Sequence, residues 1–215
     1  CTLELSSFYF DIRKDALYCD PIVSLRRQAC LTVMDIIFQR LATWLAPVMC
    51  FTMEEVWKTR FPNQETSVHL QLFKKAPKEW FNQDIAKDIE IIRIFRGQVS
   101  EAIEPMRRDK QIKSSLEASV AGPKNSDLVK ATSNLGISLK SSYSDPCNPS
   151  DTLADYLIVS ICELSDNNNK IDVIDLKETG FNKCERSWKY FEGDGEITDR
   201  DAAAVEFFEN NIEID

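Results

Sequence analysis

The sequence of 215 residues has few of the residue types from which most enzyme sites are built. It contains one histidine, His69, and six glycines, and its cysteines form no Cys-x-x-Cys pair. With no second histidine or cysteine cluster nearby, we interpret His69 as a packed or surface residue rather than a metal ligand or base. The glycines form no phosphate-binding loop, and no nucleophile–base pair is evident. An independent enzyme is therefore disfavoured.

Patterns for disulfides, membrane insertion and secretion are also missing. The seven cysteines are odd in number, which favours free thiols in a reducing cytoplasm over a disulfide framework. No segment approaches the roughly 18 apolar residues of a membrane span, and no signal peptide is visible. We predict a cytoplasmic protein with no membrane partner. Because the sequence begins with Cys1 rather than Met, we expect it to be a piece of a longer polypeptide.

The charge balance is acidic and uneven. The formal net charge is −9, which argues against an indiscriminate polyanion binder but leaves room for a local basic patch. Residues 183–215 contain ten acidic and four basic residues, so the end of the chain is the most acidic part. The chain is 43% hydrophobic, enough for a sizeable core in one large domain or two small ones.

Residues 24–57 are predicted to form the centre of a helical bundle. Their apolar residues recur in steps of three and four, which places them on one helical face; they include Leu25, Leu31, Met34, Phe38, Leu41 and Leu45. Pro47 ends this helix, and a second helix starts near Phe51. Thr52 is predicted to cap it, Glu55 to complete a capping box, and Phe51 to pack on Val56.

The same spacing predicts two further bundle helices, at residues 3–18 and 82–108. After residue 117 the period changes and predicts a small α+β unit. In chain order we expect a strand at 118–120, a helix at 126–135, a loop at 136–150, a buried strand at 156–164 and an alternating strand at 170–176. The turn at 166–169 predicts that the last two strands form a hairpin.

Two basic clusters lie off the apolar stripes. The first comprises Arg13, Lys14, Arg26 and Arg27 on the predicted bundle. The second, which we call the basic segment, is the run from Arg107 to Lys113, with Arg107, Arg108, Lys110 and Lys113 as its cations. Each cluster is either a phosphate-binding patch or a solvated charged face, and composition alone does not choose between these alternatives.

Four phrases of the sequence together resemble a known family. They are LSSFYFDIRKDALYCD (5–20), LATWLAPVMCFTMEEVW (41–57), KQIKSSLEASV (110–120), and LADYLIVS (153–160) leading into KCERSWKY (183–190). In this order they are similar to the C-terminal third of bacterial-type isoleucyl-tRNA synthetases. The first two phrases also fit the sister valyl enzyme, but the C-x-R-x-W element favours the isoleucyl family.

The resemblance implies a mainly α fold with three parts. These are a helical anticodon-binding bundle (1–113), a small α+β junction unit (114–180) and a degenerate zinc-binding-like element (181–215). It also implies the partners: isoleucine tRNA, and the upstream catalytic and editing domains of the same polypeptide, but no DNA. The catalytic domain uses ATP with Mg²⁺. Its H-I-G-H-like and K-M-S-K-S-like signatures are absent here, so we expect this piece alone to be inactive.

The final element departs from the family pattern. The family carries two cysteine pairs there, whereas this sequence keeps only Cys184, with Ser187, Thr198 and Asp201 at the other positions. A structural zinc site needs four Cys or His ligands, so we expect no metal. Arg186 and Trp188 survive from the motif.

The resemblance directs Arg186 and Trp188 at the anticodon, Arg186 through a phosphate or base edge and Trp188 by stacking on a base. The alternative for Trp188 is packing with Tyr190 and Phe191 in a small core that replaces the zinc. At the level of the whole chain, the alternative to a tRNA-binding region is a free-standing helical adaptor that binds protein through its acidic end.

Overall fold

The computed structural model describes residues 2–63, 65–140 and 145–211. Cys1, part of the predicted loop 136–150 and the last residues of the predicted C-terminal element lie outside the described residues. As predicted, the fold is mainly α. None of the helices in the described ranges is long and apolar enough to cross a membrane.

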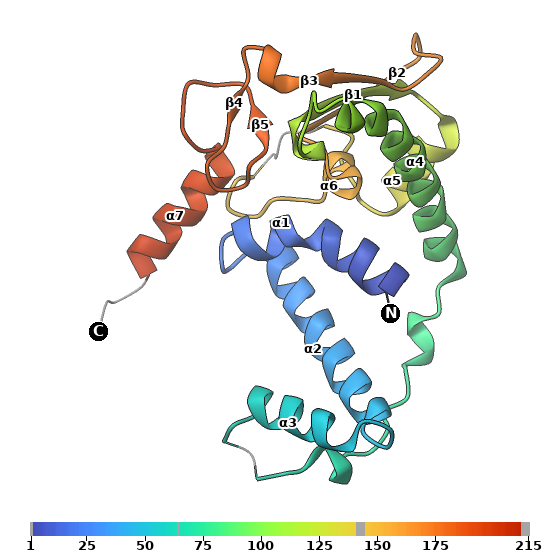
Figure 1. Ribbon diagram of the computed structural model, residues 1–215, viewed down its shortest axis with the longest axis vertical. Coiled ribbons are helices and arrows are strands. Elements are labelled where there is room, and N and C mark those ends of the chain that lie inside the picture. Colours follow the sequence, from blue (N-terminus) through green and yellow to red (C-terminus); the bar gives the residue numbers. More distant parts are fainter. Residues whose placement is uncertain (1, 64, 141–144, 212–215) are drawn as a thin grey trace. The chain divides into compact units, whose positions relative to one another are not determined.

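The helices are α1 (Asp11–Cys19), α2 (Leu25–Leu45), α3 (Cys50–Arg60), α4 (Gln83–Arg108), α5 (Ser126–Asn134), α6 (Leu153–Leu157) and α7 (Asp199–Asn211) (Figure 1). A π-helix (Thr2–Phe10) leads into α1, and short 3₁₀ turns lie at Val68–Leu70, Lys78–Trp80, Ser115–Glu117 and Leu176–Glu178. The strands are β1 (Ala118–Pro123), β2 (Ile161–Ser165), β3 (Asp172–Asp175), β4 (Asn182–Lys183) and β5 (Tyr190–Phe191).

The chain divides into two compact units. Unit 1 combines Cys1–Gln28 with Gln83–Asp215, and unit 2 is Ala29–Asn82. These units do not follow the predicted boundaries after residues 113 and 180, because α4 packs on α5 and β3 from the predicted junction unit. The three-part division implied by the family stays a prediction.

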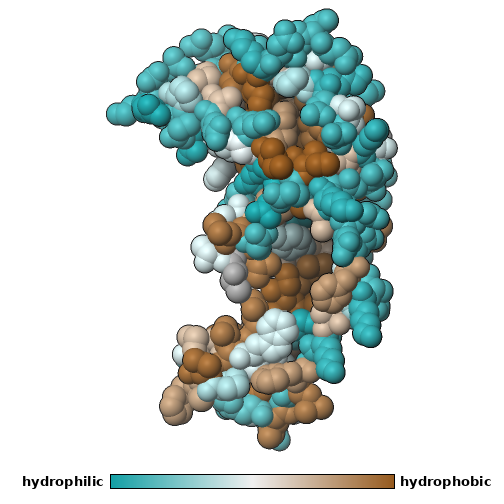
Figure 2. Space-filling view, turned by 90° about the vertical axis from the view of Figure 1, so that its right-hand side faces the viewer, coloured by the Kyte–Doolittle hydropathy of each residue, from teal (hydrophilic) through white to brown (hydrophobic). Residues whose placement is uncertain are grey.

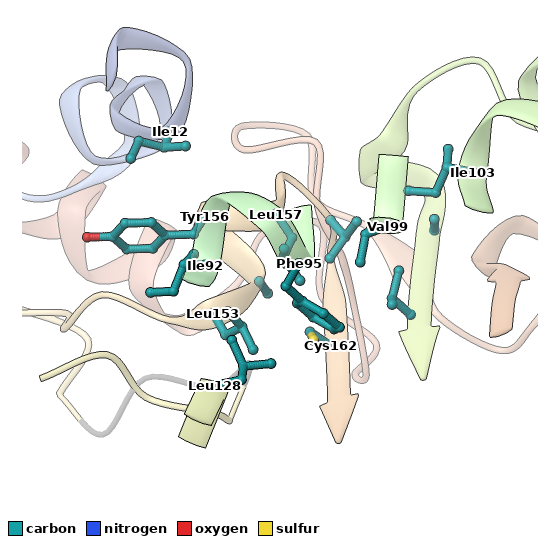
Figure 3. Close-up of a cluster of buried hydrophobic side chains, with 14 of the residues drawn as sticks. Ile12, Ile92, Phe95, Val99, Ile103, Leu128, Leu153, Tyr156, Leu157 and Cys162 are labelled. Carbon is teal, nitrogen blue, oxygen red and sulfur yellow. The ribbon is translucent and has the colours of Figure 1, made fainter. Parts of the chain in front are cut away.

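Unit 1 has a continuous hydrophobic core, in which one face of α4 is completely covered. Ile92, Phe95, Val99 and Ile103 are buried there, and Figure 3 shows them among side chains from α1, α5, α6 and β2. The helical spacing of Ile85, Ile89, Ile92, Val99 and Ile103 predicts this face, although Ile85 near the start of α4 is exposed.

The three-stranded sheet has the order β2-β1-β3, with β1 parallel to β2 and antiparallel to β3. The predicted hairpin at 156–176 is therefore wrong, because β1 lies between its two strands. Residue 122 on β1 is a glycine for a steric reason, since a Cβ there would lie 3.0 Å from the Phe95 ring. A side chain at residue 122 would push α4 away from the sheet.

The predicted strand at 156–164 is also partly wrong. Its first residues belong to α6, a five-residue helix that is buried throughout. Thr152 and Asp155 form a complete capping box at the start of α6, and Ile158 ends it in the left-handed conformation with φ 56°. Capping hydrogen bonds satisfy backbone donors that would otherwise be buried without partners. This short helix fixes the positions of Asp155 and Tyr156.

Unit 2 has a small core of its own. Ala42, Ala46, Trp57 and Val68 are buried in it, and the rings of Trp57 and Phe61 lie 4.7 Å apart between centroids. Much of the remaining apolar surface of this unit is open, as the brown side chains in the lower part of Figure 2 show. The most exposed examples are Val48, Phe51, Leu70 and Leu72.

The predicted packing of residues 24–57 is therefore corrected. Leu31 and Leu45 of the apolar stripe are exposed, because α2 makes no extensive contact with another helix or strand of the described chain. The predicted cap is also wrong: α3 begins at Cys50, its N-cap residue Met49 accepts no side-chain hydrogen bond, and Phe51 is 92% exposed. In the turn between the two helices, the Leu45 carbonyl accepts hydrogen bonds from the amides of Val48 and Met49.

Candidate nucleic-acid interface

The basic segment lies at the end of α4 and in the turn that follows it. Pro105 does not end the helix, which runs on to Arg108. Lys110 then adopts a left-handed conformation, with φ 59°, and its amide donates to the Arg107 carbonyl at 3.1 Å. This reversal buries Ile112 almost completely. The chain is therefore anchored within the basic segment, although the cations themselves point outward.

The four cations of the basic segment are exposed. Within the described residues, none of their side chains forms a hydrogen bond or an ion pair. Arg107 and Arg108 also occupy the last turn of α4, where the helix dipole favours positive charge. These side chains keep their full charge available for an external anion.

Glu117 fixes the far end of the basic segment. Its carboxylate accepts a hydrogen bond from the Lys113 amide at 2.7 Å and forms an ion pair with Lys177 at 3.1 Å. Burial alone would raise the pKa of Glu117, but these bonds hold that pKa below its usual value. Since Glu117 is occupied by the Lys113 backbone, it leaves the Lys113 ammonium free.

Trp188 is the second exposed feature of unit 1 that suits a nucleic acid. Its side chain is 63% exposed, and its backbone has a φ of 61°. The Trp188 amide donates to the Cys184 carbonyl at 3.0 Å, and the Lys183 ammonium lies 5.9 Å from the ring centroid. Such exposure contradicts the alternative in which Trp188 forms a core with Tyr190 and Phe191. An open indole face beside a cation suits a stacked base.

Two of the predicted site residues are instead internal. Arg26 has a side chain that is only 8% exposed, and it forms ion pairs with Asp20 at 2.7 Å and Asp155 at 3.0 Å. Arg13 binds both carboxylate oxygens of Asp151, at 2.6 and 2.7 Å. The expectation that Arg13 and Arg26 form a surface patch is wrong, because Arg13 is paired with the partly buried Asp151 and Arg26 with buried carboxylates. A guanidinium that already has such partners gains little from a phosphate.

Lys14 and Arg27 lie at the margin of this region. Lys14 is exposed and forms an ion pair with Asp11 at 2.9 Å, whereas Arg27 is half-buried and donates to the Asp20 carbonyl at 2.8 Å. Exposed pairs of this kind contribute little to stability. Of these two residues, only Lys14 presents its charge to solvent.

Arg186 joins the C-terminal element to α1. It donates to the backbone carbonyls of Tyr18 at 3.1 Å and Cys19 at 2.5 Å, and it lies 3.2 Å from an Asp201 oxygen. The last carbonyls of a helix lack partners and carry partial negative charge, so a guanidinium there caps α1. Arg186 thus binds groups within the chain, whereas Trp188 of the same motif is exposed to solvent.

The internal cations form one charged cluster with aspartates from several elements. We call it the buried ion network; it comprises Arg13, Asp15, Asp20, Arg26, Asp151, Asp155, Arg186, Lys189, Arg200 and Asp201. Burial alone would raise the pKa of Asp155, but Lys189 and Arg26 lower it strongly. Burial dominates at Asp20, whose pKa is raised in spite of Arg26. The sequence alone did not identify Asp15, Asp20, Asp151 or Asp155 as partners of these cations, because no spacing rule connects residues that are far apart in the chain.

The residues at the family's zinc positions do come together. Cys184 and Thr198 both donate to the same Asp201 oxygen, at 3.0 and 2.8 Å, and the Ser187 amide donates to the Cys184 sulfur at 3.4 Å. Only one thiol and one carboxylate are zinc ligands of the usual kinds. Among the described residues, no group of three or more His, Cys, Asp or Glu side chains is arranged to hold a metal. These residues do not fit zinc.

A model of the family described as the anticodon-binding domain of tRNA ligase matches residues 1–121. The chain belongs to this family. The predicted family resemblance is thus confirmed, and the basic segment falls inside the matched anticodon-binding domain. Trp188 and the C-terminal element follow it.

Curated relatives extend the similarity beyond the anticodon-binding domain. The isoleucine–tRNA ligase of Bartonella henselae is 42% identical over 214 residues, covering 94% of this chain and 21% of the relative. That of Brucella abortus is 41% identical over 217 residues with the same coverage. That of Ruegeria pomeroyi is 52% identical over 117 residues, covering 54% of this chain and 12% of the relative. The chain therefore spans about a fifth of the length of the first two relatives.

Proposed function

We propose that this chain is the tRNA-binding region of an isoleucine–tRNA ligase and that it holds the anticodon arm of isoleucine tRNA. The observation that carries the proposal is the family match over residues 1–121. Inside it lie the exposed cations of the basic segment, which have no partner among the described residues. The similarity to isoleucine–tRNA ligases over 94% of the chain supports the choice of amino acid.

The basic segment is proposed to bind the phosphates of the tRNA backbone. Its cations can approach phosphate without first breaking an internal ion pair, in contrast to Arg13, Arg26 and Arg186. The surrounding protein is acidic, with a net charge of −9, so a tRNA is repelled elsewhere and directed to this positive patch. Phosphate contacts provide affinity and orientation but no sequence information.

Trp188 is proposed to stack on an exposed base of the anticodon loop. Stacking on an aromatic ring contributes about 1–3 kcal/mol per base and is largely independent of base identity. Its left-handed backbone and the hydrogen bond to the Cys184 carbonyl hold the ring outside the protein surface. Arg186 contributes to RNA binding only indirectly, because it attaches the element that carries Trp188 to α1.

The activity of the whole polypeptide is part of the same proposal. The parent enzyme charges isoleucine tRNA with isoleucine in the cytoplasm, using ATP and Mg²⁺ in a catalytic domain upstream of these residues. The catalytic and editing domains are then covalent partners of this region. The acceptor end of the tRNA reaches the catalytic domain while the anticodon arm is held here.

Filter binding with an isoleucine tRNA transcript tests the proposal. The logarithm of the association constant is expected to fall with the logarithm of salt concentration, with a slope of about −3 for four phosphate contacts. Valine tRNA is the matched competitor, and unlabelled isoleucine tRNA should compete at least as well as it does, because phosphate contacts and stacking discriminate little between the two. Binding that is absent at low salt, or independent of salt, contradicts the proposal and favours a protein-binding adaptor. Stronger binding of valine tRNA assigns the region to the valyl enzyme.

A further inference from the structure

The family's four zinc positions form a hydrogen-bonded cluster centred on one carboxylate. We call Cys184, Ser187, Thr198 and Asp201 the Asp201 cluster. Asp201 is fully buried and accepts from the Cys184 thiol, from the Thr198 hydroxyl and from two guanidiniums. A metal ion in a structural site also joins two sequence-distant turns by binding donors from each. The carboxylate therefore occupies the role that the ion has in such sites.

The charges around Asp201 oppose a cation. An Asp201 oxygen lies 3.2 Å from the Arg186 guanidinium, and the Arg200 guanidinium lies 3.2 and 3.3 Å from the two oxygens. A zinc ion bound by Asp201 would have to displace these groups or lie within a few ångströms of two positive charges. Like charges in a buried site repel strongly because little solvent screens them.

Ser187 gives a separate indication that the site has changed its chemistry. Its hydroxyl is buried and has no hydrogen-bond partner within the described part of the chain. A hydroxyl is not one of the usual zinc ligands, which are thiolate, imidazole and carboxylate. Ser187 thus joins the cluster through its amide, while its hydroxyl takes no part in the described hydrogen bonds.

From these contacts we infer that Asp201, with Arg186 and Arg200, replaces zinc as the centre that holds the C-terminal element, so that this element presents Trp188 without any metal. The element is attached to the rest of unit 1 by Arg186 and Arg200 together with Lys189. Arg200 pairs with Asp15 of α1, Arg186 caps α1, and Lys189 binds Asp155 at 2.5 Å. Asp201 is a positioning residue: it acts on RNA only through the turn from Cys184 to Trp188.

The metal content of the native protein tests the first half of the inference. Protein purified without chelator from zinc-supplemented medium should contain less than about 0.1 zinc per chain, and a strong chelator should leave its melting temperature unchanged. About one zinc per chain that disappears in Cys184→Ser, together with a chelator-induced drop in melting temperature, overturns the inference. This measurement needs no tRNA, so it remains decisive even where the proposed function fails.

The Asp201→Asn variant tests the second half. It keeps the size of the side chain but leaves Arg186 and Arg200 without their shared anion, so the melting temperature should fall by about 5 °C or more. Asp194→Asn is the matched control, because Asp194 is an exposed acid of the same element with no partner among the described residues. It should melt like the native protein. Equal melting temperatures for the two variants contradict a central role for Asp201.

The consequence for RNA binding rests on the proposed function. Below its melting temperature, Asp201→Asn should bind isoleucine tRNA several-fold more weakly, and combining it with Trp188→Ala should add little to the loss from Trp188→Ala alone. Fully additive losses would show that Asp201 does not act through Trp188 and would overturn the positioning role.

Discussion

Arg26 and Asp20 form a two-pronged ion pair, in which the Arg26 Nε and Nη2 atoms each lie 2.7 Å from a different carboxylate oxygen of Asp20. Arg26 also binds Asp155, so one guanidinium joins the start of α2, the turn before it and α6. This geometry changes the interpretation of Arg26 from a surface cation that meets RNA to a structural one that holds unit 1 together.

Charge reversal at Arg26 should therefore destabilise the fold. Arg26→Glu removes the bidentate partner of buried Asp20, leaves Asp155 with Lys189 as its remaining close cation and adds another carboxylate, so the free energy of unfolding should fall by about 3–5 kcal/mol. Urea denaturation followed by circular dichroism measures this loss. Lys130→Glu on the exposed face of α5 is the control, and it should change stability by less than about 0.5 kcal/mol. Equal effects of the two reversals would refute the structural role.

Charge reversal of the four cations in the basic segment should affect tRNA binding much more than stability. The melting temperature should fall only slightly, because these side chains are exposed and make no ion pairs in the described chain, so that the main loss is the favourable interaction of Arg107 and Arg108 with the helix dipole. Affinity for isoleucine tRNA should fall by more than tenfold, and the slope of the salt dependence should approach zero. Filter binding at several salt concentrations measures both. If affinity and slope survive, the cations are only solvated.

Trp188→Ala should weaken tRNA binding by about 5- to 150-fold, which corresponds to the loss of about 1–3 kcal/mol of stacking. Stability should change little, since the side chain is 63% exposed. Trp188→Phe should keep part of the affinity because a smaller ring still stacks. Trp44→Ala, at another exposed tryptophan, is the control for nonspecific loss of an aromatic surface. Equal losses at both positions would argue against a specific platform.

The buried ion network should make the protein sensitive to acid. The pKa of Asp155 is far below its value in an unfolded chain, so its contribution to stability is complete above about pH 5 and is lost as the pH falls. Asp20 acts in the opposite direction, because its raised pKa means that protonation relieves a cost of burial. The urea midpoint should therefore hold down to about pH 5 and fall as the pH is lowered from there to about pH 2, less steeply in Asp155→Asn, which starts lower at neutral pH. A midpoint independent of pH in the native protein would contradict this.

The chain by itself should not catalyse isoleucine-dependent exchange between ATP and pyrophosphate. The sequence has neither nucleotide-binding signature of the synthetase family. Its single histidine, His69, is exposed, and among the described contacts its ring bonds to the Cys50 carbonyl at 3.2 Å. Exchange assays at high protein concentration, with a mock purification as background, check this. Activity that copurifies with the protein through several columns would contradict the expectation.

The sequence by itself determined the family, the helical class and the one face of α4 that is buried. These are local or collinear properties: Ile92, Val99 and Ile103 follow the helical period whatever they pack against. The basic segment could also be identified, because its cations are close together in the sequence, next to a predicted helix end. The period failed where a helix has no extensive contact over part of its surface, as with Leu31 and Leu45 of α2.

Only the tertiary structure decided which cations are free. In the sequence, Arg26 and Arg107 are the same residue type. In the structure, Arg26 binds Asp155, which lies 129 residues further along the chain, whereas Arg107 has no anionic partner in the described chain. Strand order was likewise undetermined, since the turn at 166–169 permits a hairpin and the sheet places β1 between its arms. The physical reason is the same in both cases. Charge pairing and strand pairing depend on distances through space, and sequence spacing fixes those distances only within a single element.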